Sequence, residues 1–258
     1  MTCAKWKLQT NTESRSPGSH DRDKDFTKEY NSKLSRAFST TGRESRMKNK
    51  EELIRKIRQV FRSNDYPGDA LLVGSTEGCE AYDEVTPFRN RTDWTSIEPS
   101  FLDAHSSALS FFSEAGLRFF LPAYLTADLQ GQLKSADPVV PLTHGFSDIE
   151  VRTTINNREF VVRTGKSELV NPRRYGAGTF YDYAQFRLSI FTREEAQVIV
   201  SYLEYKRDFD WPSPDRERID AALDGYWRSR AMNAPTNEDL RQHLRANADF
   251  IAASKEPQ

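Results

Sequence analysis

Residues 94–133 read WTSIEPSFLDAHSSALSFFSEAGLRFFLPAYLTADLQGQL, the most apolar and most clearly helical part of the chain. In its first half, residues recur at the spacing of one helical face: Phe101, His105, Ala108, Leu109 and Phe112. Residues 117–125 are apolar nearly all round, interrupted only by Arg118, which is typical of a helix covered on several sides. The segment therefore predicts central helices that are separated at Ser113, a good N-cap, and kinked at Pro122.

Composition indicates one globular domain in a reducing compartment. The 258 residues are 37% hydrophobic and 12% aromatic, enough to bury one substantial core. Two cysteines, Cys3 and Cys79, are too few for a disulfide framework. The net charge of −1 gives no general attraction to nucleic acid or anionic membranes. No apolar run reaches the roughly 18 residues of a membrane span, so we expect a cytoplasmic protein without membrane contact.

The N-terminal 46 residues differ from the rest of the chain. They are rich in Ser, Thr, Arg, Lys and Asp and carry few apolar residues, so we predict that residues 1–46 are disordered. Met47 directly precedes the first strongly periodic helix, which suggests the hypothesis that translation begins there. The predicted folded domain spans residues 47–258.

Two helices are predicted before the central segment. Residues 48–62 carry an apolar stripe with basic residues on the other face, which indicates an amphipathic helix. The turn Tyr66-Pro-Gly-Asp69 follows it. A shorter helix is predicted over about residues 77–88, with Cys79 as a small buried hydrophobe on its apolar face.

The period changes from helix to strand after residue 145. Apolar and polar residues alternate over residues 149–155 and again over 158–163, with Asn156-Asn157 between them, which predicts a β-hairpin. The glycine- and aromatic-bearing residues 166–187 indicate a loop or an irregular third strand. We treat residues 143–187 as a hairpin and loop insertion.

The last third of the chain is again helical. Thr192-Arg-Glu-Glu195 is a capping box that opens one helix, residues 219–227 mark another, and Thr236 opens a final helix over residues 236–253. The predicted fold class is therefore mainly α: a single multi-helix domain with an inserted β-hairpin and a disordered N-terminal segment.

Several spaced motifs occur in one order along the chain: Tyr66-Pro-Gly-Asp69, His105-x-x-Ala-Leu-x-Phe-Phe112, Arg118-Phe-Phe-Leu-Pro-Ala-Tyr-Leu125 and Phe191-Thr-x-x-Glu195. In this combination the chain resembles an uncharacterised bacterial family, a domain of unknown function, over roughly residues 48–230. The resemblance implies common ancestry but no activity. The long N-terminal segment and residues 145–187 depart from the family pattern.

One set of polar residues could carry chemistry. Standard nucleotide, metal and nucleophile motifs are missing from the sequence, and no cofactor or metal is expected. His105 lies on the apolar stripe and Arg118 in an apolar segment, where a buried charge demands a partner such as Asp69 or Asp103. With Asp69, these residues could form the polar floor of a pocket with His105 as acid or base. Alternatively, they form a structural network that fixes the Pro-Gly turn.

A second set interleaves basic and aromatic side chains: Lys166, Arg173, Arg174, Tyr175, Phe180, Tyr181, Tyr183 and Arg187. Nucleic acid would use the aromatics for stacking and the arginines for phosphates. The near-zero net charge argues against nucleic acid. The aromatics could instead dock the hairpin on the helices.

Two function classes follow. The first is a non-enzymatic macromolecule-interaction module, such as a bacterial accessory or immunity-like protein, that binds another protein through residues 145–187. Its binding residues would be Arg173, Arg174, Tyr175, Phe180 and Tyr181, because Tyr, Phe and Arg supply binding hot spots. The second is an uncharacterised hydrolase-like enzyme with a pocket around His105. The oligomeric state is left open.

Removing residues 1–46 should leave a folded domain of unchanged stability, because this segment contributes little apolar burial. Differential scanning calorimetry of the shortened chain should show the cooperative transition of the full chain at the same midpoint. Loss of that transition would show that the segment is structural.

Overall fold

A computed structural model describes residues 40–74, 79–155, 158–171, 176–209, 216–243 and 245. The contacts divide the chain into two units, Met1–Met47 and Lys48–Gln258, and the fold below is that of the second. It is mainly helical, as predicted. Of residues 1–46, which were predicted to be disordered, 1–39 lie outside the described residues, whereas 40–46 form the start of a helix, so the prediction was wrong for these.

Helix α2 spans Thr40–Phe61 and contains the predicted amphipathic helix. Its apolar stripe, represented by Leu53, Ile57 and Phe61, is buried. The predicted turn follows, with Gly68 at a φ of 90°, a left-handed conformation that favours glycine. The 3₁₀ helix η1 then spans Asp69–Leu71.

The predicted second helix is shorter than expected. Helix α3 spans Glu80–Val85 and continues into the 3₁₀ helix η2, Thr86–Phe88, while residues 75–78 lie outside the described part. Cys79 is exposed, so the prediction that it is buried was wrong. It lies before the first turn of α3 and not on the helix's inner face.

The first half of the central segment is not one continuous helix. It forms η3 (Trp94–Ser96), α4 (Pro99–Ala104) and α5 (Ala108–Phe111). The break falls at His105, whose backbone leaves the helical region at φ −113° and ψ 50°. The Tyr124 hydroxyl donates to the His105 carbonyl at 3.0 Å, so a distant side chain satisfies a backbone group at the break.

Helix α6, Glu114–Leu129, confirms the prediction for the second half. The Ser113 hydroxyl accepts from the Gly116 N–H at 3.0 Å, the expected N-cap bond. Pro122 lies inside the helix, and almost every residue from Gly116 to Leu129 is buried. The helix therefore occupies the centre of the core.

After α7 (Val139–Thr143), strand β1, Asp148–Ile155, pairs antiparallel with β2, Arg158–Gly165. Asp148 lies opposite Gly165, and Ile155 opposite Arg158. The residues of the predicted turn, 156–157, lie outside the described residues. That these strands are an insertion stays a prediction.

Helix α9, Phe180–Leu188, replaces the loop or irregular strand predicted over residues 166–187. Thr179 and Asp182 form a reciprocal capping box at its start, which favours a helix over a strand. Ala184, Arg187 and Leu188 form its buried face. A single bridge between Leu169 and Thr179 closes the preceding segment.

The C-terminal third consists of α10 (Arg193–Phe209), α11 (Arg216–Ala222), the π-helical turn η4 (Leu223–Trp227) and α12 (Arg228–Asn233). The capping box predicted for α10 is half formed: Glu195 accepts from the Thr192 N–H at 2.9 Å, but the Thr192 hydroxyl donates to Asn237. The final helix begins after Thr236, whose N–H and hydroxyl donate to Asp239, and is described over residues 237–243 and at 245.

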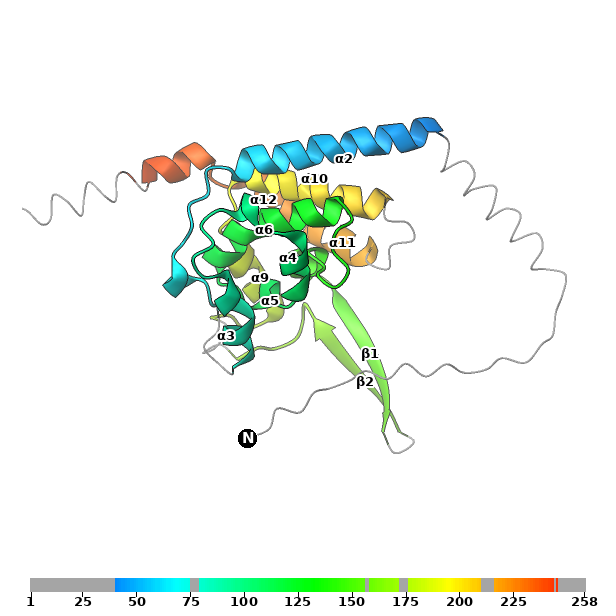
Figure 1. The fold of residues 1–258 in the computed structure, drawn as a ribbon. Helices are drawn as coiled ribbons and strands as arrows, with labels where there is room; N and C mark the ends of the chain where they lie inside the picture. Colours follow the sequence, from blue (N-terminus) through cyan, green and yellow to red (C-terminus); the bar gives the residue numbers. More distant parts are fainter. Residues whose placement is uncertain are drawn as a thin grey trace, which may run out of the picture. The chain divides into compact units, whose positions relative to one another are not determined.

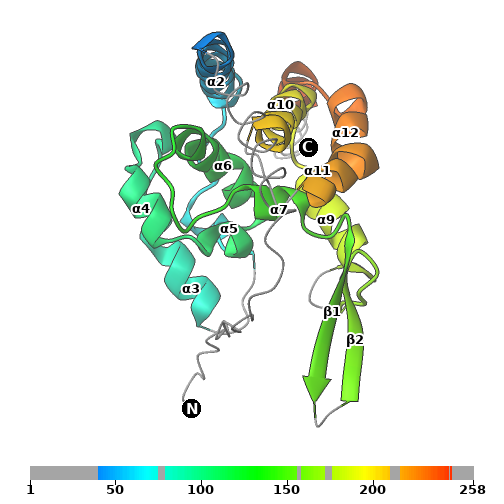
Figure 2. The same cartoon turned by 90° about the vertical axis from the view of Figure 1, so that its right-hand side faces the viewer.

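One hydrophobic core joins these elements. Helices α3 to α6 form one side of the domain and α9 to α12 the other, with α7 between them and the β1–β2 hairpin extending away (Figures 1 and 2). Phe101 is half-buried and packs on the core, and the other predicted core residues are fully inside it: Leu109, Phe112, Leu117, Phe120, Leu121, Tyr124, Ile199, Leu203 and Trp227. Among the helices described, none is long and apolar enough to cross a membrane.

Phe112→Ala should lower the free energy of unfolding by about 3–5 kcal/mol, the usual loss for a truncated core aromatic. Phe112 is 2% exposed, and its ring packs against Phe88 and Phe120. Phe186→Ala is the matched control, because Phe186 is 60% exposed and its truncation should change little. Urea unfolding of both variants measures the difference, and equal midpoints would contradict the core assignment.

Candidate functional site

Asp69 belongs to a hydrogen-bonded link between two loops. Its Oδ1 accepts from the Tyr66 hydroxyl and, at 2.9 Å, from the Asn90 N–H. These two hydrogen bonds lower the pKa of Asp69, while burial and the bond to Asp69 raise the pKa of Tyr66 to about 12. The Tyr66 ring packs against Phe119, with centroids 5.3 Å apart. Asp69 therefore fixes the Tyr-Pro-Gly-Asp turn to the core surface.

Arg118 pairs with a carboxylate that the sequence analysis did not consider. Its Nε donates to both carboxylate oxygens of Glu195, at 3.0 and 3.1 Å, and its Nη2 to Asn64 at 3.2 Å. The Glu195 side chain is completely buried. The predicted partners, Asp69 or Asp103, were wrong: Asp103 instead accepts from backbone N–H groups in residues 134–136.

His105 lies between aromatic rings. Its imidazole centroid is 4.7 Å from that of Phe101 and 5.8 Å from that of Phe88. Asp69, His105 and Arg118 take part in three separate sets of contacts. No hydrogen bond or ion pair of the described residues joins any two of them into the predicted structural network, and only Asp69 fixes the turn.

The predicted partner-binding set is only partly described. Arg173, Arg174 and Tyr175 lie outside the described residues. Phe180 and Tyr181 occupy the first turn of α9 and are half-buried. The Phe180 ring meets His144 edge-on at 5.0 Å.

Tyr181 docks this region on the C-terminal helices. Its ring lies 5.9 Å from that of Phe146, and its hydroxyl donates to the Gly225 carbonyl at 3.5 Å. The Lys166 ammonium lies over the Tyr181 ring at 4.9 Å. The predicted docking role of the aromatics is thus consistent with the contacts of both Phe180 and Tyr181.

Three large apolar side chains within residues 145–187 are exposed. None of them was predicted to be a binding residue. Leu169 is 82% exposed, Phe186 60% and Val161 52%. Phe186 lies on the outer face of α9, a helix that the sequence analysis missed, so its exposure could not be foreseen. Leu169 follows the end of β2.

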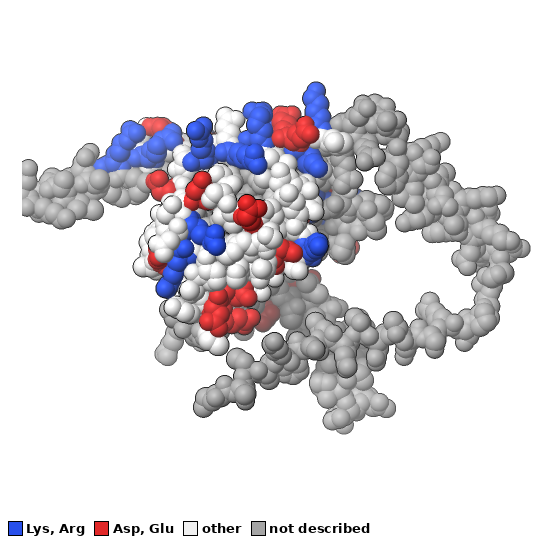
Figure 3. Space-filling model, viewed as in Figure 1, with Lys and Arg blue, Asp and Glu red and all other residues white. Residues whose placement is uncertain are grey.

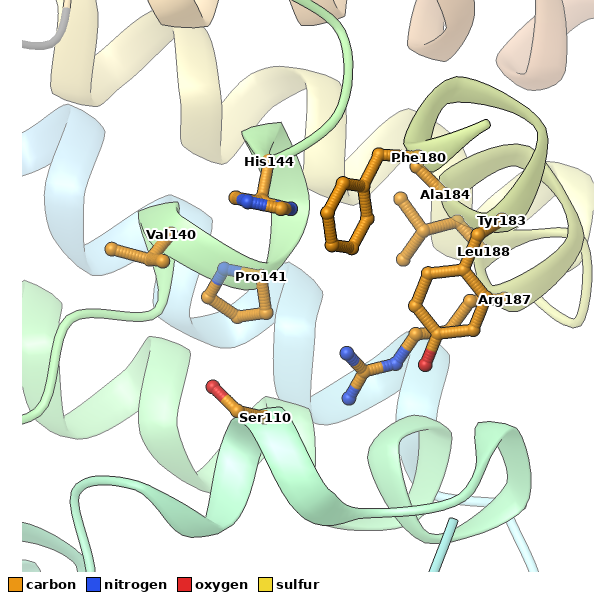
Figure 4. Close-up of a pocket in the computed structure, with 9 residues that line it drawn as sticks. All are labelled: Ser110, Val140, Pro141, His144, Phe180, Tyr183, Ala184, Arg187 and Leu188. Carbon is orange, nitrogen blue, oxygen red and sulfur yellow. The ribbon is translucent and has the colours of Figure 1, made fainter. Parts of the chain in front are cut away.

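A cavity of about 220 Å³ lies among α5, α7 and α9 (Figure 4). Its lining combines apolar and polar side chains: Ser110, Val140, Pro141, His144, Phe180, Tyr183, Ala184, Arg187 and Leu188. Arg187 is 9% exposed, and its Nη2 donates to the carbonyls of Leu109 and Phe112 at 2.5 and 3.3 Å. This burial differs from the surface position predicted for Arg187.

Burial changes the titration of two groups that line this cavity. Desolvation lowers the pKa of Arg187, and desolvation together with the positive charge of Arg218 lowers the pKa of His144. His144 is an exposed residue, yet the Phe180 ring covers part of its imidazole. The lowered pKa favours an uncharged imidazole at neutral pH.

Charged residues elsewhere on the surface are of mixed sign. On the face shown in Figure 3, basic side chains run along α2 together with acidic ones, and Lys56 pairs with Glu52 at 3.2 Å. Within the described part of the chain, no group of three or more His, Cys, Asp or Glu could hold a metal ion.

Comparison with known proteins identifies a family. The description "Family of unknown function (DUF6714)" applies to residues 49–231, and the chain belongs to this family. The cavity and the β1–β2 hairpin both lie within the matched residues. No curated protein and no solved structure matched the chain.

Arg118→Met should destabilise the protein by about 3–5 kcal/mol, because it leaves the buried Glu195 carboxylate without its cation. The double variant Arg118→Met/Glu195→Gln should recover part of this loss, because it also removes the stranded charge. Arg228→Met is the control: its ion pairs with Asp224 and Glu204 are exposed, and their loss should cost under about 1 kcal/mol. Urea unfolding measures all three, and equal effects of Arg118→Met and Arg228→Met would disprove the assignment.

Proposed function

We propose that this member of the DUF6714 family is a non-enzymatic interaction module, an accessory or immunity-like protein of the bacterial cytoplasm, whose partner is another protein. Its recognition surface is residues 145–187, which include the β1–β2 hairpin and most of α9. The observation that carries the proposal is the exposure of apolar side chains on this surface beside a hairpin that extends from the helical body (Figure 2).

The hairpin offers backbone groups for recognition. Its sheet has two strands, so within the described residues each strand has one edge without a neighbouring strand. Such an edge can accept an added strand from a partner, with backbone hydrogen bonds for affinity. An inserted hairpin is a common way to add a binding element to a scaffold, since function concentrates on segments that a rigid core positions.

Exposed apolar side chains within residues 145–187 supply a driving force for association. Burying the exposed parts of Leu169, Phe186 and Val161 would stabilise a complex by roughly 25 cal/mol per Å² of apolar surface removed from water. Exposed apolar groups of this kind commonly mark sites of protein–protein contact when they lie together.

The same contacts favour a protein over nucleic acid as the partner. Lys166 lies over the Tyr181 ring, and Arg187 is buried and bonded to backbone carbonyls, so neither is placed to bind successive phosphates. The alternative of a hydrolase-like enzyme around His105 gains no support from its contacts. The imidazole packs between Phe88 and Phe101, and no hydrogen bond or ion pair of the described residues joins it to a nucleophile or carboxylate.

The double variant Leu169→Ser/Phe186→Ser should weaken binding of the partner at least about tenfold, as expected when two apolar anchors are lost. The partner is identified by photo-crosslinking from a benzophenone residue placed at position 169, in the cells from which the protein comes. It is then purified, and the Kd is measured by calorimetry.

Met232→Ser is the matched control, because Met232 is 67% exposed and lies outside residues 145–187. Its Kd should stay within about twofold of wild type, and all variants should keep their thermal midpoints, since exposed positions contribute little to stability. A partner that binds the double variant and the wild type equally well would refute this recognition surface.

A further inference from the structure

We propose that the cavity among α5, α7 and α9 binds a small organic carboxylate, with the Arg187 guanidinium as its counter-ion. The inference concerns a small-molecule site, and it stands independently of the proposed protein partner. It rests on a buried charge with which no carboxylate of the described residues forms an ion pair.

Arg187 is more than nine-tenths buried, and no carboxylate of the described residues forms an ion pair with it. Arginine keeps its proton even where burial lowers its pKa, so the charge remains. Arg118 provides a contrast within the same domain: it is more exposed, and Glu195 neutralises it at 3.0 Å. Because a buried cation without an anion is costly, an anionic ligand would complete the Arg187 site.

The guanidinium is held in a fixed orientation. Its Nη2 donates to the carbonyls of Leu109 and Phe112 at the end of α5, where helical carbonyls lack intrahelical partners. This structural role occupies Nη2, whereas neither Nη1 nor the fully buried Nε has a hydrogen-bond partner among the described residues. A buried donor without an acceptor is rare in native proteins, and here it belongs to a side chain that lines a cavity.

The cavity's lining indicates the ligand's class. A planar carboxylate matches the geometry of a guanidinium, and Val140, Phe180 and Leu188 would pack against an apolar body (Figure 4). The Ser110 and Tyr183 side chains supply polar groups. A volume of about 220 Å³ is below the roughly 300–1,000 Å³ of drug-sized sites, so the ligand is a small acid.

Local charge favours a monoanion over a phosphate dianion. The lowered pKa of His144 favours its uncharged form, and Arg187 is the one Lys or Arg side chain among the residues that line the cavity. Glu114 is near enough to act electrostatically on Arg187, which disfavours a second negative charge. A carboxylate needs one guanidinium, whereas a dianion would need more positive charge.

The test is a titration of the ¹⁵N-labelled full chain with benzoate, followed through the Arg187 Nε–Hε resonance. The resonance is assigned by its loss in Arg187→Lys. Saturable movement of this resonance is expected, together with NOEs from the benzoate ring to the Val140 and Leu188 methyl groups. These NOEs are measured on the wild-type protein, so they do not depend on whether a variant folds.

Two matched variants locate the site. Ser110→Phe places a ring in the cavity and should weaken benzoate binding at least about tenfold, a change of about 1.4 kcal/mol. Ser107→Phe makes the same change one helical turn earlier, at a position that does not line this cavity, and should leave the affinity unchanged.

Three results would overturn the proposal. An Arg187 resonance that does not move on addition of benzoate would show that benzoate does not bind at Arg187. Inorganic phosphate binding at least as tightly as benzoate would contradict the carboxylate assignment. Equal weakening by Ser107→Phe and Ser110→Phe would show that benzoate binds elsewhere.

Discussion

The domain depends on the fully buried carboxylate of Glu195. It accepts the N–H of Thr192 at the start of α10 and both bonds of the Arg118 Nε from the middle of α6. The same guanidinium reaches Asn64, just after α2. A charge taken out of water must be paired and hydrogen-bonded. These bonds therefore link the end of α2 and the start of α10 to α6.

Around this polar centre, α6 can be apolar nearly all round because other elements cover it on every side. Arg118 is the one charged side chain in residues 117–125, and its guanidinium lies where the ends of α2 and α10 meet α6. On the other side of the core, the buried Tyr124 donates to the carbonyl at the break between α4 and α5. Polar bonds thus set how the elements meet, while apolar burial provides most of the stability.

Helix ends that are set by residues close in sequence could be predicted from the sequence. Features that involve contacts between residues far apart in the sequence could not. Ser113 and Thr236 begin helices as expected, because an N-cap acts within a few residues. The carbonyl at the His105 break accepts from a hydroxyl 19 residues away, and the partner of Arg118 lies 77 residues away, so neither contact could be found from spacing. Helix α9 did carry a local signal, the Thr179–Asp182 capping box, but its aromatic residues and the preceding hairpin suggested another strand. For the same reason the sequence placed Arg187 on a surface.

Arg118 and Arg187 both lie in apolar surroundings, but they differ in role. Arg118 stabilises the fold, whereas Arg187 is available to bind a ligand. The Glu195 carboxylate neutralises Arg118, whereas the other two residues predicted as catalytic candidates, Asp69 and His105, make separate contacts. Arg187 donates hydrogen bonds to two backbone carbonyls, which orient its guanidinium without neutralising its charge. Structural networks and functional sites both bury charged groups, so burial alone does not distinguish them. The distinction lies in whether a carboxylate of the described residues forms an ion pair with the buried cation. By this criterion the candidate ligand site is the cavity beside α9 and not the surroundings of His105.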